Sequence, residues 1–198
     1  MTKHRKKQSN TEGSIRIIGG TLRGRKISFP NIQGLRPTGD RIRETLFNWL
    51  QPDIGDSRCL DLFSGSGALG FESASRGAAE VVMVESDSHA YMQLKQQAEL
   101  LKTSVCKLHH QTAQQFISSA QGHFDIVYID PPFSAQLWAS IADSLVLQSL
   151  LHAGAKIYLE QPRQMAIDTL PPSWFLLKEK QAGDVIYCLF EYQPGAKS

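Results

Sequence analysis

The chain has 198 residues, of which 41% are apolar and 20% charged, so it can bury one full hydrophobic core. These values exclude a disordered or fibrous chain, and no apolar run approaches the roughly 20 residues of a membrane span. Because residues 1–10 are basic and lack the apolar core of a signal peptide, we expect a cytoplasmic protein without a membrane partner.

A net charge of +2 conceals an asymmetry along the chain. Residues 1–50 contain 11 Lys and Arg against 3 acids, which gives +8, whereas residues 51–198 contain 10 against 16, which gives −6. A basic segment joined to an acidic body indicates a polyanionic partner, usually nucleic acid. The three cysteines lack metal-ligand spacing, so we expect reduced structural residues and no metal site; they are Cys59, Cys106 and Cys188.

The N-terminal part of the chain is predicted to form a tail and a small hairpin. Residues 1–13 are polar and show no apolar periodicity, which is typical of a flexible basic tail. Residues 15–18 and 25–29 resemble two short strands joined by a glycine-containing turn. Because such a hairpin is too small to be stable alone, we expect it to pack against the main domain.

A helix is predicted next, over residues 41–50, with Asp40 as its N-cap. Apolar residues recur at helical spacing and mark one buried face: Ile42, Leu46, Phe47, Trp49 and Leu50. Arg43 is not needed on that face and is left for other contacts. We predict that residues 14–50 form an extension that contacts the polyanionic partner and that residues 51–198 form the main domain.

From residue 58 onward, strand-like and helix-like segments alternate, which is typical of a parallel sheet covered on both faces. The predicted strands are residues 59–62, 81–85, 105–108, 126–129 and 156–160. The predicted helices are residues 68–76, 88–101, 113–120 and 137–150. Residues 174–178 and 185–192 indicate a closing antiparallel pair. The fold class is therefore α/β.

A glycine-rich turn connects the first strand of this domain to its first helix. Glycine at 65 and 67 allows a tight turn and a close approach of the backbone to a ligand. Glu85 ends the next strand, where a carboxylate can accept hydrogen bonds from both ribose hydroxyls of an adenosine ligand. Asp61 is expected near the amino-acid end of that ligand. These residues alone leave two ligand classes open, dinucleotides and S-adenosylmethionine.

The fourth strand leads directly into Asp130-Pro131-Pro132-Phe133. The two prolines fix the backbone and remove two donors, so carbonyl groups and the Asp130 carboxylate remain as acceptors for N–H groups. Such acceptors can orient a planar exocyclic amine toward a sulfonium methyl group while Phe133 stacks on the base. The motif favours S-adenosylmethionine-dependent methylation of a base amine, which requires an unpaired or flipped base.

Both motifs together resemble the class I amino-methyltransferases, which include enzymes that act on DNA adenine and on protein glutamine. Three N-terminal segments narrow this choice. They are Arg16-Ile17-Ile18-Gly19-Gly20, Arg23-Gly24-Arg25-Lys26 and the run from Leu35 to Leu50, which contains Arg36-Pro37-Thr38-Gly39-Asp40. All three closely resemble the RsmD family, bacterial methyltransferases of a guanine N2 in 16S ribosomal RNA.

This resemblance implies a Rossmann-like class I S-adenosylmethionine-dependent methyltransferase fold with a mostly parallel seven-stranded sheet and an antiparallel C-terminal strand. It also implies a monomer with 16S ribosomal RNA of the small ribosomal subunit as its partner. The cofactor-binding residues carried over by position are Asp61, Phe63, Ser64, Gly65, Gly67, Glu85, Thr112 and Ala113. Asp130 to Phe133 would hold the guanine. The residues expected to contact RNA are Arg16, Arg23, Arg25, Lys26, Arg36, Arg41 and Arg43.

Three readings stay open beside this one. A methyltransferase of DNA adenine or protein glutamine shares the two motifs but would need another recognition element. An oxidoreductase dependent on a nicotinamide dinucleotide would need a hydride-transfer acid or base, which the motifs do not supply. A nonenzymatic RNA-binding protein would not depend on Asp130. Glu160, which ends the fifth predicted strand, is expected either to border the cleft or to be a solvated strand end.

Overall fold

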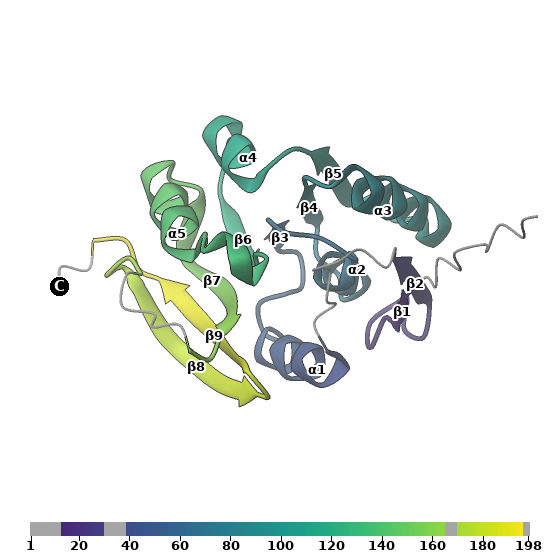
Figure 1. Ribbon diagram of the computed structural model, residues 1–198, viewed down its shortest axis with the longest axis horizontal. Coiled ribbons are helices and arrows are strands. Elements are labelled where there is room, and N and C mark those ends of the chain that lie inside the picture. Colours follow the sequence, from purple (N-terminus) through teal and green to yellow (C-terminus); the bar gives the residue numbers. More distant parts are fainter. Residues whose placement is uncertain (1–12, 30–38, 165–169, 196–198) are drawn as a thin grey trace, which may run out of the picture.

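A seven-stranded sheet with helices on both faces forms the body of the protein (Figure 1). The computed structural model describes residues 13–29, 39–164 and 170–195. The strand order is β5-β4-β3-β6-β7-β9-β8; the pairs from β5 to β7 are parallel, and β9 runs antiparallel to both of its neighbours, β7 and β8. Its strands are β3 (Arg58–Asp61), β4 (Glu80–Glu85), β5 (Cys106–His110), β6 (Phe124–Ile129), β7 (Leu151–Pro162), β8 (Trp174–Ala182) and β9 (Val185–Tyr192). The predicted mostly parallel sheet is confirmed.

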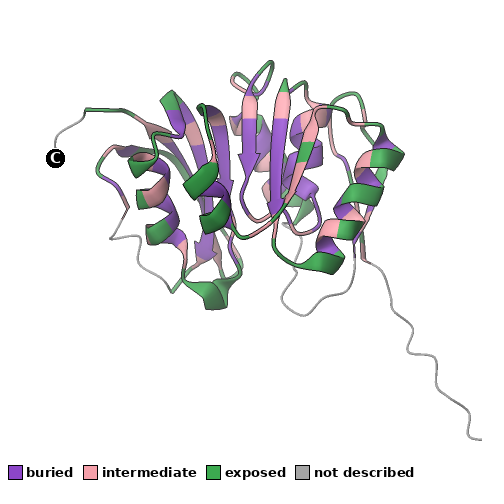
Figure 2. Cartoon of the chain, turned by 90° about the horizontal axis from the view of Figure 1, so that it is seen from above, coloured by how far each residue is buried: buried purple, intermediate pink, exposed green. Residues whose placement is uncertain are grey.

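Within the described residues, five α-helices cover the two faces of the sheet. They are α1 (Asp40–Trp49), α2 (Ala68–Ser75), α3 (Ser88–Leu101), α4 (Ala113–Ser119) and α5 (Trp138–Leu147). Alternate residues of each strand join different clusters: Leu60 packs with α4 and α5, whereas Cys59 packs with α1, α2 and α3. Figure 2 shows the resulting pattern, with mostly buried strands and helices that expose their outer sides. This two-sided burial explains the nearly continuous apolar strands.

The element bounds differ from the sequence prediction mainly near the C-terminal half. β7 begins at Leu151 rather than at residue 156, because it pairs with Phe124 before a register shift and then continues beside β6. α5 ends at Leu147, three residues before the predicted end. β8 extends to Ala182 because β9 pairs with it over its full length, although most of its side chains are exposed.

The N-terminal hairpin consists of β1 (Gly13–Arg16) and β2 (Lys26–Phe29), which pair antiparallel. Ile17 and Ile27 are buried in the same cluster as α1, α2 and α3, so the hairpin packs on the main domain as predicted. Glu72 of α2 fixes its connecting turn, because the two carboxylate oxygens accept hydrogen bonds from the backbone N–H groups of Ile18 and Gly19, both at 2.8 Å.

Two expectations for α1 are wrong. The residue at the N-cap is Gly39, and Asp40 is the first helical residue, whose carboxylate accepts from Arg43 Nη2 at 2.6 Å instead of capping the helix. Arg43 itself is completely buried and donates two hydrogen bonds to the Arg16 carbonyl, both at 3.1 Å. It also lies 3.7 Å from the buried Glu72 carboxylate. A buried, paired guanidinium ties the hairpin to α1 and α2.

Within the described parts of the chain, no helix is both long enough and apolar enough to cross a membrane.

Candidate functional site

The carboxyl ends of β4 and β3 meet at the glycine-rich turn. The Glu85 carboxylate accepts hydrogen bonds from the backbone N–H groups of Gly65, at 2.8 Å, and Asp87, at 2.7 Å. Gly67 has a φ of +79°, and a Cβ there would lie 2.4 Å from the Phe71 ring, so this position requires glycine. The turn is therefore held in one shape by Glu85 and by close packing against α2.

Asp61 ends β3 below this turn and is only 3% exposed. Burial, the largest cause, and the neighbouring charge of Glu85 together raise the pKa of its carboxyl group from 3.8 to about 7, although backbone hydrogen bonds from Phe63 and Gly70 oppose the shift. The Ser64 hydroxyl donates to the Asp61 carbonyl at 3.1 Å. A buried carboxylate with this pKa is suited to receive a cation, which would compensate its charge.

The predicted catalytic segment lies beside this turn, because β6 pairs directly with β3 and Asp130 follows the last residue of β6. Pro131 is buried, whereas Phe133 is 40% exposed and its ring centroid lies 6.3 Å from that of Trp138. The Pro132 carbonyl accepts from the Ala135 N–H at 2.8 Å and so closes a short 3-10 turn, Phe133–Ala135. The Pro132 carbonyl is therefore committed to this turn.

Four neighbouring strands carry an acid on the same face of the sheet near their carboxyl ends: Glu85, Asp61, Asp130 and Glu160. The strand register fixes this alignment. Asp61 of β3 is paired with Met83 of β4 and with Tyr128 of β6, and Ile129 of β6 is paired with Leu159 of β7. Because side chains alternate along a strand, Asp130 and Glu160 share the face of Tyr128 and Tyr158, which pack with α1 and α2. The sequence left Glu160 undecided; it is buried at this edge, not a solvated strand end.

The predicted adenine-binding residues follow β5. Thr112 caps α4: its backbone N–H and its hydroxyl both donate to Gln115 Oε1, and its hydroxyl accepts from the Gln115 N–H. Ala113 is buried at the first position of the helix. The Gln111 N–H donates to the Glu85 carbonyl at 3.1 Å, which joins this segment to β4. The polar groups of Thr112 are thus committed to the cap.

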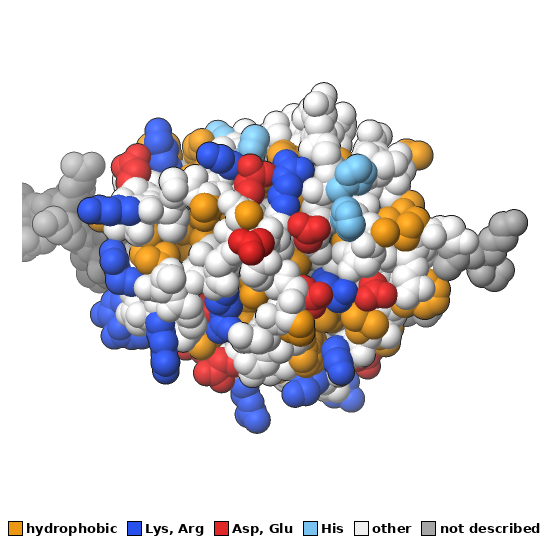
Figure 3. Space-filling model, turned by 180° about the vertical axis from the view of Figure 1, so that it is seen from behind, with side chains coloured by type: hydrophobic (Ala, Val, Ile, Leu, Met, Phe, Trp, Pro, Cys, Tyr) orange, Lys and Arg blue, Asp and Glu red, His pale blue; other side chains and the backbone are white. Residues whose placement is uncertain are grey.

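Most of the predicted RNA-contacting side chains are exposed on the hairpin and on α1. They are Arg16, Arg23, Arg25, Lys26 and Arg41. Arg16 donates to the Gly24 carbonyl and Arg25 to the Leu100 carbonyl, both at 3.0 Å. Figure 3 shows Lys and Arg side chains gathered along the side of the molecule where the hairpin lies.

Two predicted RNA contacts differ from these. Arg36 lies outside the described residues. Arg43 is wrong as an RNA contact, because its guanidinium is completely buried and bound to Asp40, Glu72 and the Arg16 carbonyl. The side chain is needed for packing the hairpin, which removes it from the phosphate-contacting surface.

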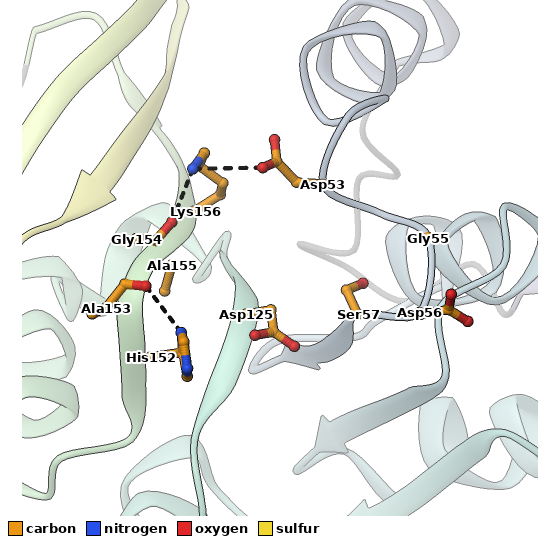
Figure 4. A pocket seen from close by; sticks show the side chains of 10 residues that line it. All are labelled: Asp53, Gly55, Asp56, Ser57, Asp125, His152, Ala153, Gly154, Ala155 and Lys156. Carbon is orange, nitrogen blue, oxygen red and sulfur yellow. Dashed lines mark hydrogen bonds and ion pairs between the residues drawn. The ribbon is translucent and has the colours of Figure 1, made fainter.

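A pocket of about 310 Å³ lies at the opposite edge of the sheet (Figure 4). Its walls are formed by the segment before β3 and by the amino-terminal parts of β6 and β7, including Asp56, Asp125 and His152. In open α/β sheets the ligand crevice lies at the carboxyl ends of the strands, so this pocket is not where the cofactor and catalytic motifs meet. Among the described residues, no group of three or more His, Cys, Asp or Glu side chains is placed to hold a metal ion.

Comparison with known proteins places the chain in a family. A family model described as "Conserved hypothetical protein 95" matches residues 15–191. The chain is 44% identical to Ribosomal RNA small subunit methyltransferase D of Haemophilus influenzae, over 92% of this chain and 96% of the relative. It is 41% identical to the protein of the same name from Escherichia coli K12, over 98% of each.

A solved structure agrees with these relatives. The structure of the putative methyltransferase yhhF from Escherichia coli superposes on this chain with a TM-score of 0.86 and 40% sequence identity. The superposition covers 91% of this chain and 99% of the yhhF chain. This likeness confirms the predicted methyltransferase fold. The chain therefore belongs to the Conserved hypothetical protein 95 family, the RsmD family that its N-terminal motifs resemble.

Proposed function

We propose that this protein transfers a methyl group from S-adenosylmethionine to the exocyclic N2 of a guanine in 16S ribosomal RNA of the small subunit. The observation that carries the proposal is the direct pairing of β3 with β6, which brings the Asp130 to Phe133 segment beside the glycine-rich turn. The relatives from Haemophilus influenzae and Escherichia coli are named as small-subunit ribosomal RNA methyltransferases, which supports the substrate class.

The residues around the turn fit S-adenosylmethionine, which supplies a methyl group on a cationic sulfur. Glu85 has a carboxylate at the end of β4 that already accepts two backbone N–H groups, which holds it in place for ribose hydroxyls. Asp61 offers a buried acid that a cationic amino group can stabilise in its ionised form. Phe63, Ser64, Gly65 and Gly67 form the backbone cradle, and Ala113 borders the adenine side.

Asp130 and the Pro131 carbonyl would hold the two hydrogens of the guanine amine so that its nitrogen lone pair faces the methyl group. No strong base is required before attack, because the nitrogen becomes acidic only as the new bond forms. Asp130 then stabilises the developing positive charge and accepts the proton. Phe133, which is 40% exposed, provides a surface on which the base can stack.

Substrate selection would come from the hairpin and α1. Their exposed cations would neutralise RNA phosphates, while the buried Arg43 keeps the hairpin in a fixed position relative to the active site. Arg36 belongs to this set by sequence resemblance. We expect the protein to act as a monomer in the cytoplasm.

The test is methyl transfer from labelled S-adenosylmethionine to small ribosomal subunits that lack the modification. We expect incorporation into 16S ribosomal RNA, with the label recovered as N2-methylguanosine by mass spectrometry. DNA and protein acceptors in the same assay should remain unlabelled. Binding of S-adenosylhomocysteine without incorporation into subunits would overturn the proposed substrate but leave the cofactor assignment.

A further inference from the structure

Glu160 occupies the last place in the row of carboxylates, next to Asp130 and farthest from Glu85. We infer that Glu160 selects guanine by accepting the ring N1–H group adjacent to the amine that Asp130 holds. This inference rests on the proposed function and assigns a specificity-determining contact within the same site. The alignment of the strands, the burial and fixation of the side chain, and the chemistry of the guanine edge each support it.

The alignment places Glu160 within reach of the same base as Asp130. Ile129 of β6 is in register with Leu159 of β7, and the backbones of adjacent strands are about 4.8 Å apart. Asp130 and Glu160 are the residues that follow this pair in the two parallel segments. Burial is the main cause of the raised pKa of the Tyr158 hydroxyl, and the charges of Glu160 and Asp130 raise this pKa further. Both charges therefore lie within electrostatic reach of the Tyr158 hydroxyl.

The carboxylate of Glu160 is held in one orientation before any ligand arrives. The residue is 7% exposed, and its Oε2 accepts a hydrogen bond of 2.8 Å from the Tyr158 hydroxyl. Its backbone carbonyl accepts from Trp138 Nε1 at 2.7 Å, and the Trp138 ring lies beside Phe133. The Trp138 indole therefore contacts both Phe133, on which the base would stack, and the backbone of Glu160, and it holds the two in a fixed relative position, as base recognition requires.

No cation compensates this charge in the part of the chain that the structure describes, since none of the ion pairs there includes Glu160. A nearly buried carboxylate with one hydroxyl donor has remaining acceptor capacity, which is costly unless N–H donors fill it. Burial accordingly raises the pKa of its carboxyl group, and the hydrogen bond from Tyr158 opposes this. A ligand with an N–H donor would relieve this cost.

Guanine supplies such a donor as a ring N–H beside its amine, whereas adenine has no ring N–H on its Watson–Crick edge. The Watson–Crick edge of guanine carries N1–H beside the N2 amine, so two neighbouring acceptors match it, and ionised carboxylates are acceptors only. The corresponding ring nitrogen of adenine is an acceptor and would face the Glu160 carboxylate unpaired. A site built around a substrate N–H rejects an analogue that lacks it strongly, because its own polar group is then left unpaired.

The experiment compares two bases that share the methyl-accepting amine. Small subunits are reconstituted on ribosomal RNA that carries either guanine or 2-aminopurine at the methylated position; 2-aminopurine keeps the amine but has an acceptor at N1. We expect the wild-type protein to favour guanine by about tenfold to a hundredfold in kcat/KM. In Glu160→Gln the amide can donate to an N1 acceptor, so this preference should fall by at least about tenfold.

Matched variants separate recognition from folding. Glu99→Gln, at an exposed position of α3, should retain the wild-type preference. Tyr158→Phe removes the hydroxyl that orients the carboxylate and should reduce the preference partially, which gives a second reading if Glu160→Gln fails to fold. Folding and site integrity are checked by thermal unfolding and by binding of S-adenosylhomocysteine.

The outcomes are distinct. A lower preference for guanine in Glu160→Gln and in Tyr158→Phe supports the inference. An unchanged preference in folded Glu160→Gln, or equal use of both bases by the wild-type protein, overturns it and leaves the proposed function standing. No methylation of guanine subunits by the wild-type protein overturns the proposed function itself, and the inference with it.

Discussion

Asp61→Asn should make the protein more stable at neutral pH, and by an amount that depends on pH. The folded protein holds the pKa of this buried carboxyl group at about 7, against 3.8 for the ordinary side chain. One pKa unit corresponds to about 1.4 kcal/mol, so keeping Asp61 ionised in the folded protein costs about 4 kcal/mol. This cost is the reason to expect a stabilised variant.

The sign of the pH dependence follows from proton uptake. Between about pH 4 and pH 7 the folded protein binds more protons at Asp61 than the unfolded chain, so the wild-type free energy of unfolding decreases as pH rises through this range. Asparagine cannot titrate, and the variant lacks this loss. The stability difference between variant and wild type should therefore grow by about 2.5 kcal/mol from pH 5 to pH 8.

The assay is urea unfolding of both proteins without cofactor, followed by circular dichroism at several pH values from 5 to 8. Comparing variant with wild type cancels the titration of groups that do not interact with Asp61, and any constant effect of the amide on the hydrogen bonds from Phe63 and Gly70 does not vary with pH. Asp56→Asn, in the exposed turn before β3, controls for the loss of one carboxylate. A stability difference for Asp61→Asn that is the same at every pH would refute the reasoning.

The same titration should appear in cofactor binding. If Asp61 receives the cationic amino group, binding below pH 7 requires that its proton leave, so the dissociation constant of S-adenosylhomocysteine should decrease up to about tenfold per pH unit from pH 6 to pH 7. Isothermal titration calorimetry in buffers of different ionisation enthalpy measures the released proton. Asp61→Asn should bind more weakly and without this slope.

Three further changes test other parts of the structure. Arg43→Ala should destabilise the protein by about 2 to 4 kcal/mol in urea unfolding, because it removes a fully buried side chain and the two hydrogen bonds to the Arg16 carbonyl, whereas Glu72 keeps Arg76 as a partner. A loss below about 1 kcal/mol would contradict the role of Arg43 in holding the hairpin. Asp130→Ala should nearly abolish methyl transfer with thermal stability and S-adenosylhomocysteine binding preserved, and retained turnover would exclude its role in holding the amine. The double variant Arg23→Ala and Lys26→Ala should weaken subunit binding and lower its salt dependence by about 2 in the log–log slope, whereas an unchanged slope would place these side chains away from RNA.

The sequence determined the elements of the α/β domain well, because they depend on local patterns. The strands β6 and β4 are buried on both faces, and a strand of this kind is apolar at nearly every position, which the sequence shows directly. The tight turn was also predicted from the glycines at 65 and 67. In the structure, Gly67 has a positive φ and packs closely against Phe71, which leaves room for glycine alone. The joining of β4, β3 and β6 at one sheet edge follows from the usual order of such folds.

Side chains whose environment is made by distant segments were not determined in this way. Arg43 looked like one more arginine of a basic stretch, but the partners that bury it are Arg16, which is 27 residues away in the sequence, and Glu72 of α2. The prediction of Asp40 as the N-cap of α1 was wrong for a local reason, because its carboxylate pairs with Arg43, three residues later in the same helix. Ion pairs between separate elements leave no periodic signal in a sequence.

Glu160 shows this division most clearly. By itself the sequence determined an α/β methyltransferase chain with two motifs and a basic front segment, since glycine spacing, prolines and apolar periodicity are local properties. Only the tertiary structure decided that Glu160 is buried beside Asp130 and bound by Tyr158, and that Arg43 serves packing rather than RNA. The physical reason is that burial and charge compensation are set by neighbours in space, which the register of β6 with β7 and the packing of the hairpin bring together.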